Sequence, residues 1–190
     1  MFERTISRQM GRIKSRLRTT KTGCKKKTSC LYRIKKALVK SQRSKTGLSC
    51  KKILEITKCF PNFIGCFNQE TIGKLNILSK PVTFMVYVGK ENGHWIAVGL
   101  FASSIEIFDP LGFDIFNWPT VPCQFLNFIH ANSFNKKLFI SSKVQPDSST
   151  LCGFYCLVYI TKRLTMSFDK IQSLFKKPSN NDYLLRKLFN

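Results

Sequence analysis

The sequence predicts an α+β fold, a mixed β-sheet flanked by helices, with a basic N-terminal extension. Two observations lead to this prediction. Segments of helical periodicity and apolar runs typical of strands alternate irregularly along the chain, unlike the regular alternation of a parallel α/β sheet. The chain has 190 residues, 43% of them hydrophobic and 17 of them Phe, which suffices for one domain with a sizeable core.

Positive charge is concentrated at the start of the chain. The formal net charge is +22, and residues 1–52 contribute 17 of it, with 18 Lys and Arg residues against the single acid Glu3. Such a segment attracts polyanions, so we expect nucleic acid as its partner. A solvated tail without a partner and an anionic membrane surface are the alternatives. We therefore predict a flexible nucleic-acid-binding arm, 1–48, and a folded domain, 49–190.

Helical spacing in the arm is confined to short stretches. Residues 2–18 have a narrow apolar stripe that would become ordered against a partner, and 31–40 is a second short basic helix. Residues 19–29 and 40–49 lack periodicity and are predicted linkers. The residues expected to contact nucleic acid are basic side chains along this arm: Arg12, Lys14, Arg16, Arg18, Lys25, Lys26, Lys27, Lys35 and Lys36.

The folded domain is predicted to begin with a helix over 50–59 and to continue as strands. Apolar, partly β-branched runs predict strands over 82–88, 95–101 and 104–108, and the short link between the last two suits an antiparallel hairpin. The remaining expected elements are a helix within 119–134 capped by Thr120, a strand over 137–141, an apolar helix from Cys152 to Lys162, and two amphipathic helices capped by Ser167 and Asn181.

Eight cysteines raise the question of disulfides or metal. The first 18 residues have no apolar core typical of a secretory signal, and no run approaches the roughly 20 apolar residues of a membrane span, so we expect intracellular, mostly reduced thiols. The spacing of Cys24 and Cys30 is unusual for a zinc site, and no histidine lies nearby. We therefore expect no metal and no small-molecule cofactor.

The two histidines have different surroundings. His130 lies near the C-terminal end of a predicted helix, where it is expected to be exposed or to act as a cap. His94 follows a Gly-containing turn and begins a strand, so its ring can face a cleft. If the hairpin forms, Asp109 lies beside His94 and can accept one imidazole proton, leaving the other nitrogen as a base. The alternative is that Asp109 only caps the DPLG turn.

The segment 145–156, QPDSSTLCGFYC, places Cys152 in the first turn of the apolar helix, after small polar residues that often cap helices. Unpaired N–H groups at a helix start lower a thiol pKa and can bind an oxyanion. Gln145 could add an amide donor to such an oxyanion hole, and Gly153 would let a substrate backbone approach. Cys156 lies one turn deeper and is predicted to belong to the core.

The segments GHWIAVGL, IFDPLGF and VQPDSSTLCGFYC resemble those of the adenovirus protease family, the adenain-like cysteine endopeptidases, over roughly residues 50–165. These enzymes are distant relatives of the Ulp1-type SUMO proteases. The resemblance implies a papain-like or adenain-like fold with His94 as general base, Asp109 as orienting acid, Cys152 as nucleophile and Gln145 as oxyanion donor. It also implies a monomeric viral enzyme of the virion and host nucleus that cleaves virion precursor proteins, at sites containing Gly, during maturation.

Two features depart from the family pattern. The stretch FNKKLFISSKVQ lacks the cysteine through which family members link an activating viral peptide by a disulfide, and about 48 basic residues precede the protease region. The resemblance still suggests DNA and an activating peptide as cofactors, because DNA stimulates the adenovirus enzymes through their basic surface. The alternatives are a SUMO or ubiquitin-like deconjugating protease and a non-catalytic DNA-binding core protein. Leu151 stands where Ulp1-type enzymes usually have Asp before the nucleophile, which favours the viral branch.

Overall fold

The structure is a computed structural model that describes residues 23–44, 46–77, 81–89, 93–117, 121–175 and 177–189. Its elements in chain order are α2 (Gly23–Ser44), α3 (Cys50–Thr57), β1 (Phe63–Asn68), α4 (Gln69–Ile72), β2 (Val82–Val88), β3 (His94–Leu100), β4 (Ser104–Phe108), α5 (Cys123–Asn132), β5 (Lys137–Ile140), α6 (Cys152–Lys162), α7 (Phe168–Gln172), the 3-10 turn η1 (Pro178–Asn180) and α8 (Asn181–Leu188).

The sheet has five strands in the order β1-β2-β3-β4-β5. The outer pairs, β1 with β2 and β4 with β5, are parallel, and β3 is antiparallel to both of its neighbours. The mixed sheet confirms the predicted α+β class, and the pairing of β3 with β4 confirms the predicted hairpin. Strand β1 was not predicted; it is short and irregular, with a register shift between Phe63 and Gly65, where the φ of Gly65 is 146°.

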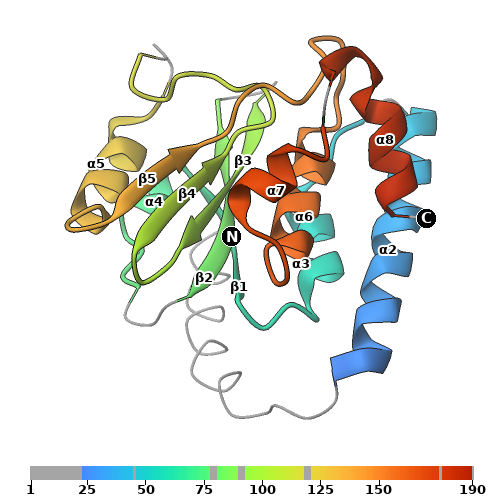
Figure 1. Cartoon of the computed structure of the whole chain (residues 1–190), viewed down its shortest axis with the longest axis horizontal. Helices are drawn as coiled ribbons and strands as arrows, with labels where there is room; N and C mark the ends of the chain where they lie inside the picture. The colour runs from blue at the N-terminus through green and yellow to red at the C-terminus, as the bar shows by residue number, and fades with distance from the viewer. Residues whose placement is uncertain are drawn as a thin grey trace.

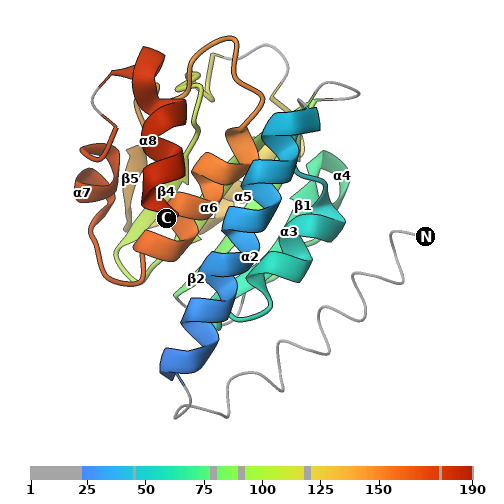
Figure 2. The same ribbon diagram turned by 90° about the vertical axis from the view of Figure 1, so that its right-hand side faces the viewer.

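Helices cover both faces of the sheet (Figure 1). The short helices α4 and α5 lie on one face, over a cluster of buried side chains that includes Phe84, Val98 and Phe125. On the other face α6 packs against β3, and α2, α3 and α8 lie around it (Figure 2). The cluster on this face extends from Ile34 in α2 to Leu185 in α8. The two faces of the sheet thus have separate cores, and α6 is the buried central helix of the second one.

A buried ion pair connects α6 to the sheet. The carboxylate of Glu106 on β4, only 2% exposed, accepts two hydrogen bonds from Arg163, from Nε at 2.7 Å and from Nη2 at 2.8 Å. The hydroxyl of Tyr159 donates to the same carboxylate at 2.8 Å. Because buried charge is costly unless it is paired and hydrogen-bonded, these donors fix where α6 lies relative to β4.

Helix α2 differs from the predicted flexible arm. Cys30, Ile34 and Leu38 are buried in the main core, and Cys30 forms a disulfide with Cys59 after α3, with a Cα–Cα distance of 6.5 Å. These positions are four residues apart and form one apolar face, which the surrounding lysines obscured in the sequence. The expected linker over 40–49 is likewise helical as far as Ser44. The expectation of reduced thiols is corrected at the Cys30–Cys59 pair.

The predicted helix boundaries hold in part. Ser167 caps α7 as expected, its hydroxyl accepting from the N–H of Lys170. Asn181 does not cap the last helix; it is the first residue of α8 and is fully buried. The first predicted helix, 2–18, and the predicted cap Thr120 lie outside the described residues. Within the described part of the chain, no helix is both long and apolar enough to cross a membrane.

Candidate active site

His94 and Asp109 meet at one end of the sheet. His94 is the first residue of β3, and Asp109 directly follows β4, its antiparallel neighbour. The distance from His94 Nε2 to Asp109 Oδ1 is 2.6 Å, and both side chains are buried. The hairpin therefore produces the pairing that the sequence predicted.

The Asp109 carboxylate is fixed by its own turn. Oδ1 accepts from the N–H of Leu111 at 2.8 Å, and Oδ2 accepts from the N–H of Phe113 at 3.1 Å. The hydroxyl of Ser141 bonds to both the backbone N–H and the carbonyl of Asp109. Asp109 thus caps the DPLG turn and also binds His94. Nothing in the sequence identified Ser141, a single serine after a short strand.

This turn packs closely on the segment that leads to the candidate nucleophile. The Pro110 carbonyl accepts from the N–H groups of Val144 and Gln145, at 2.9 and 2.8 Å. Gly112 has φ +65°, and a Cβ there would lie 2.3 Å from the backbone N of Lys143. Glycine is therefore required at this position both by its backbone conformation and by the close approach of the two segments.

Cys152 begins α6, and its thiol is one of the groups that act on the His94 imidazole. Asp109 occupies Nε2, so Nδ1 is the ring nitrogen left for the sulfur. Burial alone would lower the His94 pKa, but hydrogen bonds with Asp109 and Cys152, together with their charges, raise it to about 9. The structure thus brings three predicted residues, Asp109, His94 and Cys152, together, with Asp109 hydrogen-bonded to a histidine that favours its protonated form at neutral pH.

The start of α6 offers backbone donors. The N-cap residue is Leu151, which has no capping side chain, and the hydroxyl of Ser149 accepts from the Leu151 N–H at 3.2 Å. The Ser149 side chain therefore forms a hydrogen bond within the loop and does not cap the helix directly. Among the described residues, the N–H groups of Cys152 and Gly153 have no acceptor, whereas the next two donate to the Leu151 carbonyl.

Gln145 lies in the same loop and is 2% exposed. Its Nε2 donates to the Ser149 carbonyl at 2.6 Å, which occupies one of its two N–H bonds. Its Oε1 is buried and has no hydrogen-bond partner in the described part of the chain. The amide therefore keeps one donor, and its use as an oxyanion donor stays a prediction.

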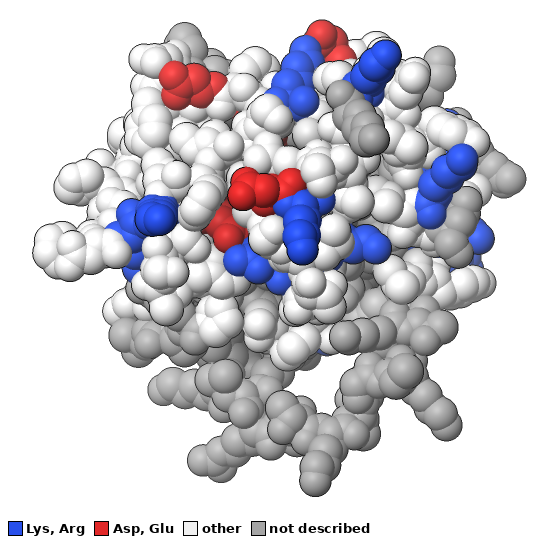
Figure 3. All heavy atoms as spheres, in the orientation of Figure 1, with Lys and Arg blue, Asp and Glu red and all other residues white. Residues whose placement is uncertain are grey.

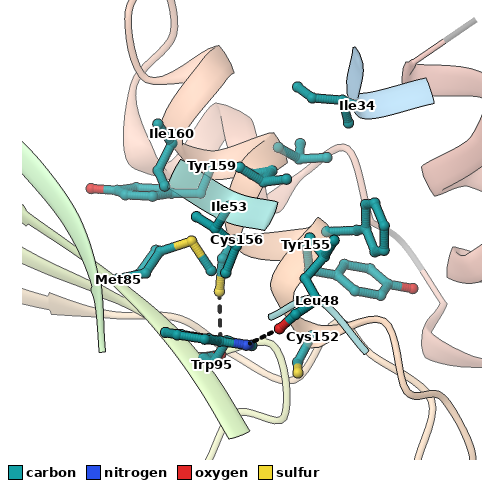
Figure 4. Packing of buried hydrophobic residues seen from close by; sticks show 14 of the residues in the cluster. Ile34, Leu48, Ile53, Met85, Trp95, Cys152, Tyr155, Cys156, Tyr159 and Ile160 are labelled. Carbon is teal, nitrogen blue, oxygen red and sulfur yellow. Dashed lines mark hydrogen bonds between the residues drawn. The ribbon is translucent and has the colours of Figure 1, made fainter. Parts of the chain in front are cut away.

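Gly153 has a packing role that the sequence did not indicate. A Cβ there would lie 3.1 Å from Leu48 Cβ and 3.3 Å from Trp95 Cδ1, so the missing side chain makes room for these two residues. The Trp95 indole donates to the Leu48 carbonyl at 2.7 Å, and the Cys156 thiol donates to the Trp95 carbonyl at 3.2 Å (Figure 4). Cys156 is fully buried, as predicted for a core thiol, and burial raises its pKa.

A cavity of about 250 Å³ lies next to this packing, with Leu48, Cys66, Tyr87 and Trp95 among its lining residues. Its walls are mainly aromatic and aliphatic. Because Leu48 and Trp95 also contact the position of Gly153, the cavity adjoins the first turn of α6.

His130 lies apart from this site. It is exposed in the last turn of α5, which covers the opposite face of the sheet from α6 (Figure 1). The sequence prediction of an exposed histidine near a helix end is confirmed.

The predicted nucleic-acid contacts are only partly described. Lys35 and Lys36 are exposed on α2, whereas Arg12, Lys14, Arg16 and Arg18 and the side chains of Lys25, Lys26 and Lys27 lie outside the described residues. On the face drawn in Figure 3, Lys and Arg side chains are interspersed with acidic ones and do not form a single patch. In the described part of the chain, no group of three or more His, Cys, Asp or Glu residues is placed to bind a metal ion.

Comparisons with known proteins support the fold. No protein-family model and no curated protein matches the sequence. Among solved structures, the ASFV pS273R protease is similar with a TM-score of 0.50 at 17% identity, over 74% of this chain and 64% of that protein. This likeness shows that the chain has a protease-type fold and spans about two thirds of that protease.

Two further solved structures are similar at lower TM-scores. AvrA, solved with IP6 and CoA, gives 0.40 at 18% identity, over 82% of this chain and 65% of AvrA. The central domain of Lpg1148 from Legionella pneumophila gives 0.38 at 16% identity, over 67% of this chain and 84% of that domain. The resemblance to adenain itself stays a prediction.

Proposed function

We propose that this protein is a cysteine endopeptidase with Cys152 as nucleophile, His94 as general base and acid, and Asp109 as the residue that orients His94. The observation that supports this most directly is the hydrogen-bonded pair of Asp109 and His94 together with Cys152, which begins a buried helix in a protease-type fold. A histidine with a raised pKa beside a thiol is the arrangement that cysteine nucleophiles need.

The reaction would proceed in two steps. The thiol proton passes to His94 before the substrate is attacked, which gives the imidazolium expected at neutral pH, and Cys152 Sγ then attacks the carbonyl carbon of the scissile peptide. The C–N bond breaks as His94 gives its proton to the leaving amine, which leaves a thioester on the enzyme. Water then attacks the thioester and passes a proton to His94, and the C–S bond breaks to release the carboxylate product and restore the thiol.

Negative charge forms on the carbonyl oxygen in both steps. The N–H groups of Cys152 and Gly153 have no acceptor among the described residues, so they can bind this oxygen. The remaining N–H of the Gln145 amide would supply a third donor. Because these donors are held by buried backbone, they need little reorganisation when the charge develops.

The substrate side of the proposal rests on the cavity and on the family resemblance. The apolar cavity beside Trp95 has room for one aliphatic or aromatic side chain of a substrate. From the resemblance we propose virion precursor proteins cleaved at Gly-containing sites, in the virion and host nucleus, by a monomer whose basic arm binds DNA. An activating viral peptide, if one is used, would bind without a disulfide at the family's position.

The deciding experiment is cleavage of a Gly-rich peptide library by the full chain and by Cys152→Ala, each with and without DNA. We expect cleavage by the wild type alone, at a small set of Gly-containing sites, and faster cleavage when DNA is present. Cleavage only of fusions that end in Gly-Gly would instead identify a deconjugating protease. Equal cleavage by the two proteins would exclude the proposed nucleophile, and absence of cleavage with intact DNA binding would favour a non-catalytic core protein.

A further inference from the structure

The loop between β5 and α6 is fixed from outside by the last helix. At the start of the loop, Asn181 Nδ2 donates to the Val144 carbonyl at 2.7 Å. At its end, the Ser149 hydroxyl donates to Asp182 Oδ1 at 2.9 Å. Residues 144–151 thus form a loop whose two ends are both bonded to neighbouring residues of α8.

The same carboxylate oxygen also binds α6. The Tyr155 hydroxyl donates to Asp182 Oδ1 at 2.7 Å, so one oxygen joins the end of the loop to the first turn of α6. Burial, together with the hydrogen bond to Asp182 and its charge, raises the pKa of the Tyr155 hydroxyl. The tyrosine therefore stays a neutral donor at all working pH values, and its bond to the carboxylate persists.

Ser149, which is bonded to Asp182, is also hydrogen-bonded to the residues that carry the candidate oxyanion donors or precede them. Its carbonyl accepts from Gln145 Nε2 at 2.6 Å, and its hydroxyl accepts from the Leu151 N–H at 3.2 Å. Leu151 is the N-cap residue, directly before the N–H of Cys152. A shift of Ser149 would consequently move both the Gln145 amide and the backbone donors at the start of α6.

We infer that Asn181 and Asp182 are positioning residues, through which α8 sets the geometry of the oxyanion donors and of Cys152. The inference rests on the proposed peptidase function, because it assigns these residues to that reaction. The loop has no strand or helix of its own, so its backbone needs outside bonds to stay in one conformation. Catalytic donors must keep their positions to about 0.5 Å. Asp182 is hydrogen-bonded to Ser149, whose movement would displace these donors.

The test compares three variants on one helix. Asp182→Ala removes both hydrogen bonds, Asp182→Asn keeps an acceptor oxygen in the same place, and Arg186→Ala changes an exposed residue one turn further along. We expect Asp182→Ala to lower kcat by roughly 10- to 100-fold while KM changes less than about threefold, because substrate binding outside the loop is untouched. Asp182→Asn should recover most of the loss, and Arg186→Ala should match the wild type.

A second readout does not depend on activity. Amide hydrogen exchange over 144–153 should be faster in Asp182→Ala and in Ser149→Ala, at an unfolding midpoint close to that of Arg186→Ala. The effect of the double variant on exchange should be smaller than the sum of the two single effects, since both changes remove the Ser149–Asp182 hydrogen bond. If Asp182→Ala fails to fold, Ser149→Ala carries the same prediction for kcat and exchange.

The outcomes separate the two proposals. Equal kcat and equal exchange in Asp182→Ala and Arg186→Ala would overturn the positioning role. A fall in kcat with an equal fall in global stability, and no selective change in 144–153, would also overturn it. If the wild type cleaves no peptide, the proposed function fails, while the exchange measurement still decides whether α8 fixes the loop.

Discussion

His94 is the residue that sets the pH dependence of the site. Its pKa of about 9 means that the imidazolium, which would protonate the leaving amine in the proposed reaction, is lost as pH rises through 9. We expect kcat/KM to fall along an alkaline limb near pH 9. Asp109→Asn removes a charge that raises this pKa, so the limb should move to lower pH and kcat should also fall. An unmoved limb in Asp109→Asn would exclude His94 as its origin.

The same shift affects stability. The folded pKa of His94, about 9, lies above the unfolded value of about 6.5, so protonated His94 stabilises the fold fully below pH 6.5. This contribution is lost as pH rises from there through 9. Chemical denaturation of wild type and of His94→Ala across this range should show the difference between them shrinking with rising pH.

Two cysteines of α6 should respond in opposite ways to substitution. Cys152→Ala should fold normally and lose cleavage by 10³-fold or more, because it removes the thiol that acts on the His94 imidazole. Cys156→Ala should keep cleavage and lose about 1–2 kcal/mol of stability, because it removes a buried sulfur and its bond to Trp95. Full activity in Cys152→Ala, with loss in Cys156→Ala, would reverse the assignment.

Alkylation provides the matching chemical measurement. Cys123 is exposed and would compete for the reagent, so the experiment belongs in a Cys123→Ser background. One equivalent of iodoacetamide should then block cleavage and be found on Cys152 by peptide mapping. Modification of Cys50, which is also partly accessible, with cleavage retained would show that Cys152 is shielded.

At this scale the sequence predicted which candidate site residues lie together better than it predicted the residues that hold them in place. His94, Asp109 and Cys152 each belong to a recognisable local motif, and the hairpin register brings the first two together. Ser141 and Asp182 could not be found in this way, because their contacts depend on segments about 30 residues away in the chain. The packing of Gly153 against Leu48 could not be predicted either, since it depends on a chain segment about 100 residues earlier.

Among the elements, those with strong periodicity were predictable. The three central strands and the buried helix α6 follow directly from long apolar runs. Strand β1 was missed because a glycine with positive φ interrupts its pattern, and α4 because four residues show no period. Helix α2 was identified over 31–40, but its burial was not, since a single apolar face among many lysines does not reveal what covers it.

The disulfide between Cys30 and Cys59 should contribute much of the attachment of α2. It closes a loop with a sequence separation of 29 residues, which corresponds to about 3–4 kcal/mol in the chain-entropy account. Reduction should therefore lower the thermal midpoint by roughly 6–16 °C. Cys30→Ala should show the lower midpoint with or without reductant, and Cys123→Ser should behave as the wild type. An equal midpoint for oxidised and reduced wild type would contradict this.

For the whole molecule, the burial of α2 changes how the DNA-binding arm must be tested. Removing residues 1–48 would take Ile34 and Leu38 from the core, so the informative deletion is 1–22. This segment has seven Lys and Arg residues, and its loss should weaken DNA binding and reduce the slope of log K against log salt by up to about 6. Peptide cleavage without DNA should be unchanged.

A companion variant separates the arm from α2. Lys35→Ala with Lys36→Ala removes two exposed charges from α2 and should reduce the same slope by about 2 if α2 also contacts DNA. Equal DNA affinity and equal salt slope after deletion of 1–22 would rule out the arm as the binding segment. Fluorescence anisotropy with a short duplex at several salt concentrations measures both quantities.

The bonds from Asp182 to Ser149 and Tyr155 also set an order of events when the protein is made. Cys152 leaves the ribosome 30 residues ahead of Asp182, which at 5–20 residues per second is a delay of roughly 2–6 s. During that interval Cys152 is already part of the nascent chain, but the loop over 144–151 lacks its hydrogen bonds to Asn181 and Asp182. A peptidase built in this way would cleave neighbouring nascent chains more slowly until α8 has docked.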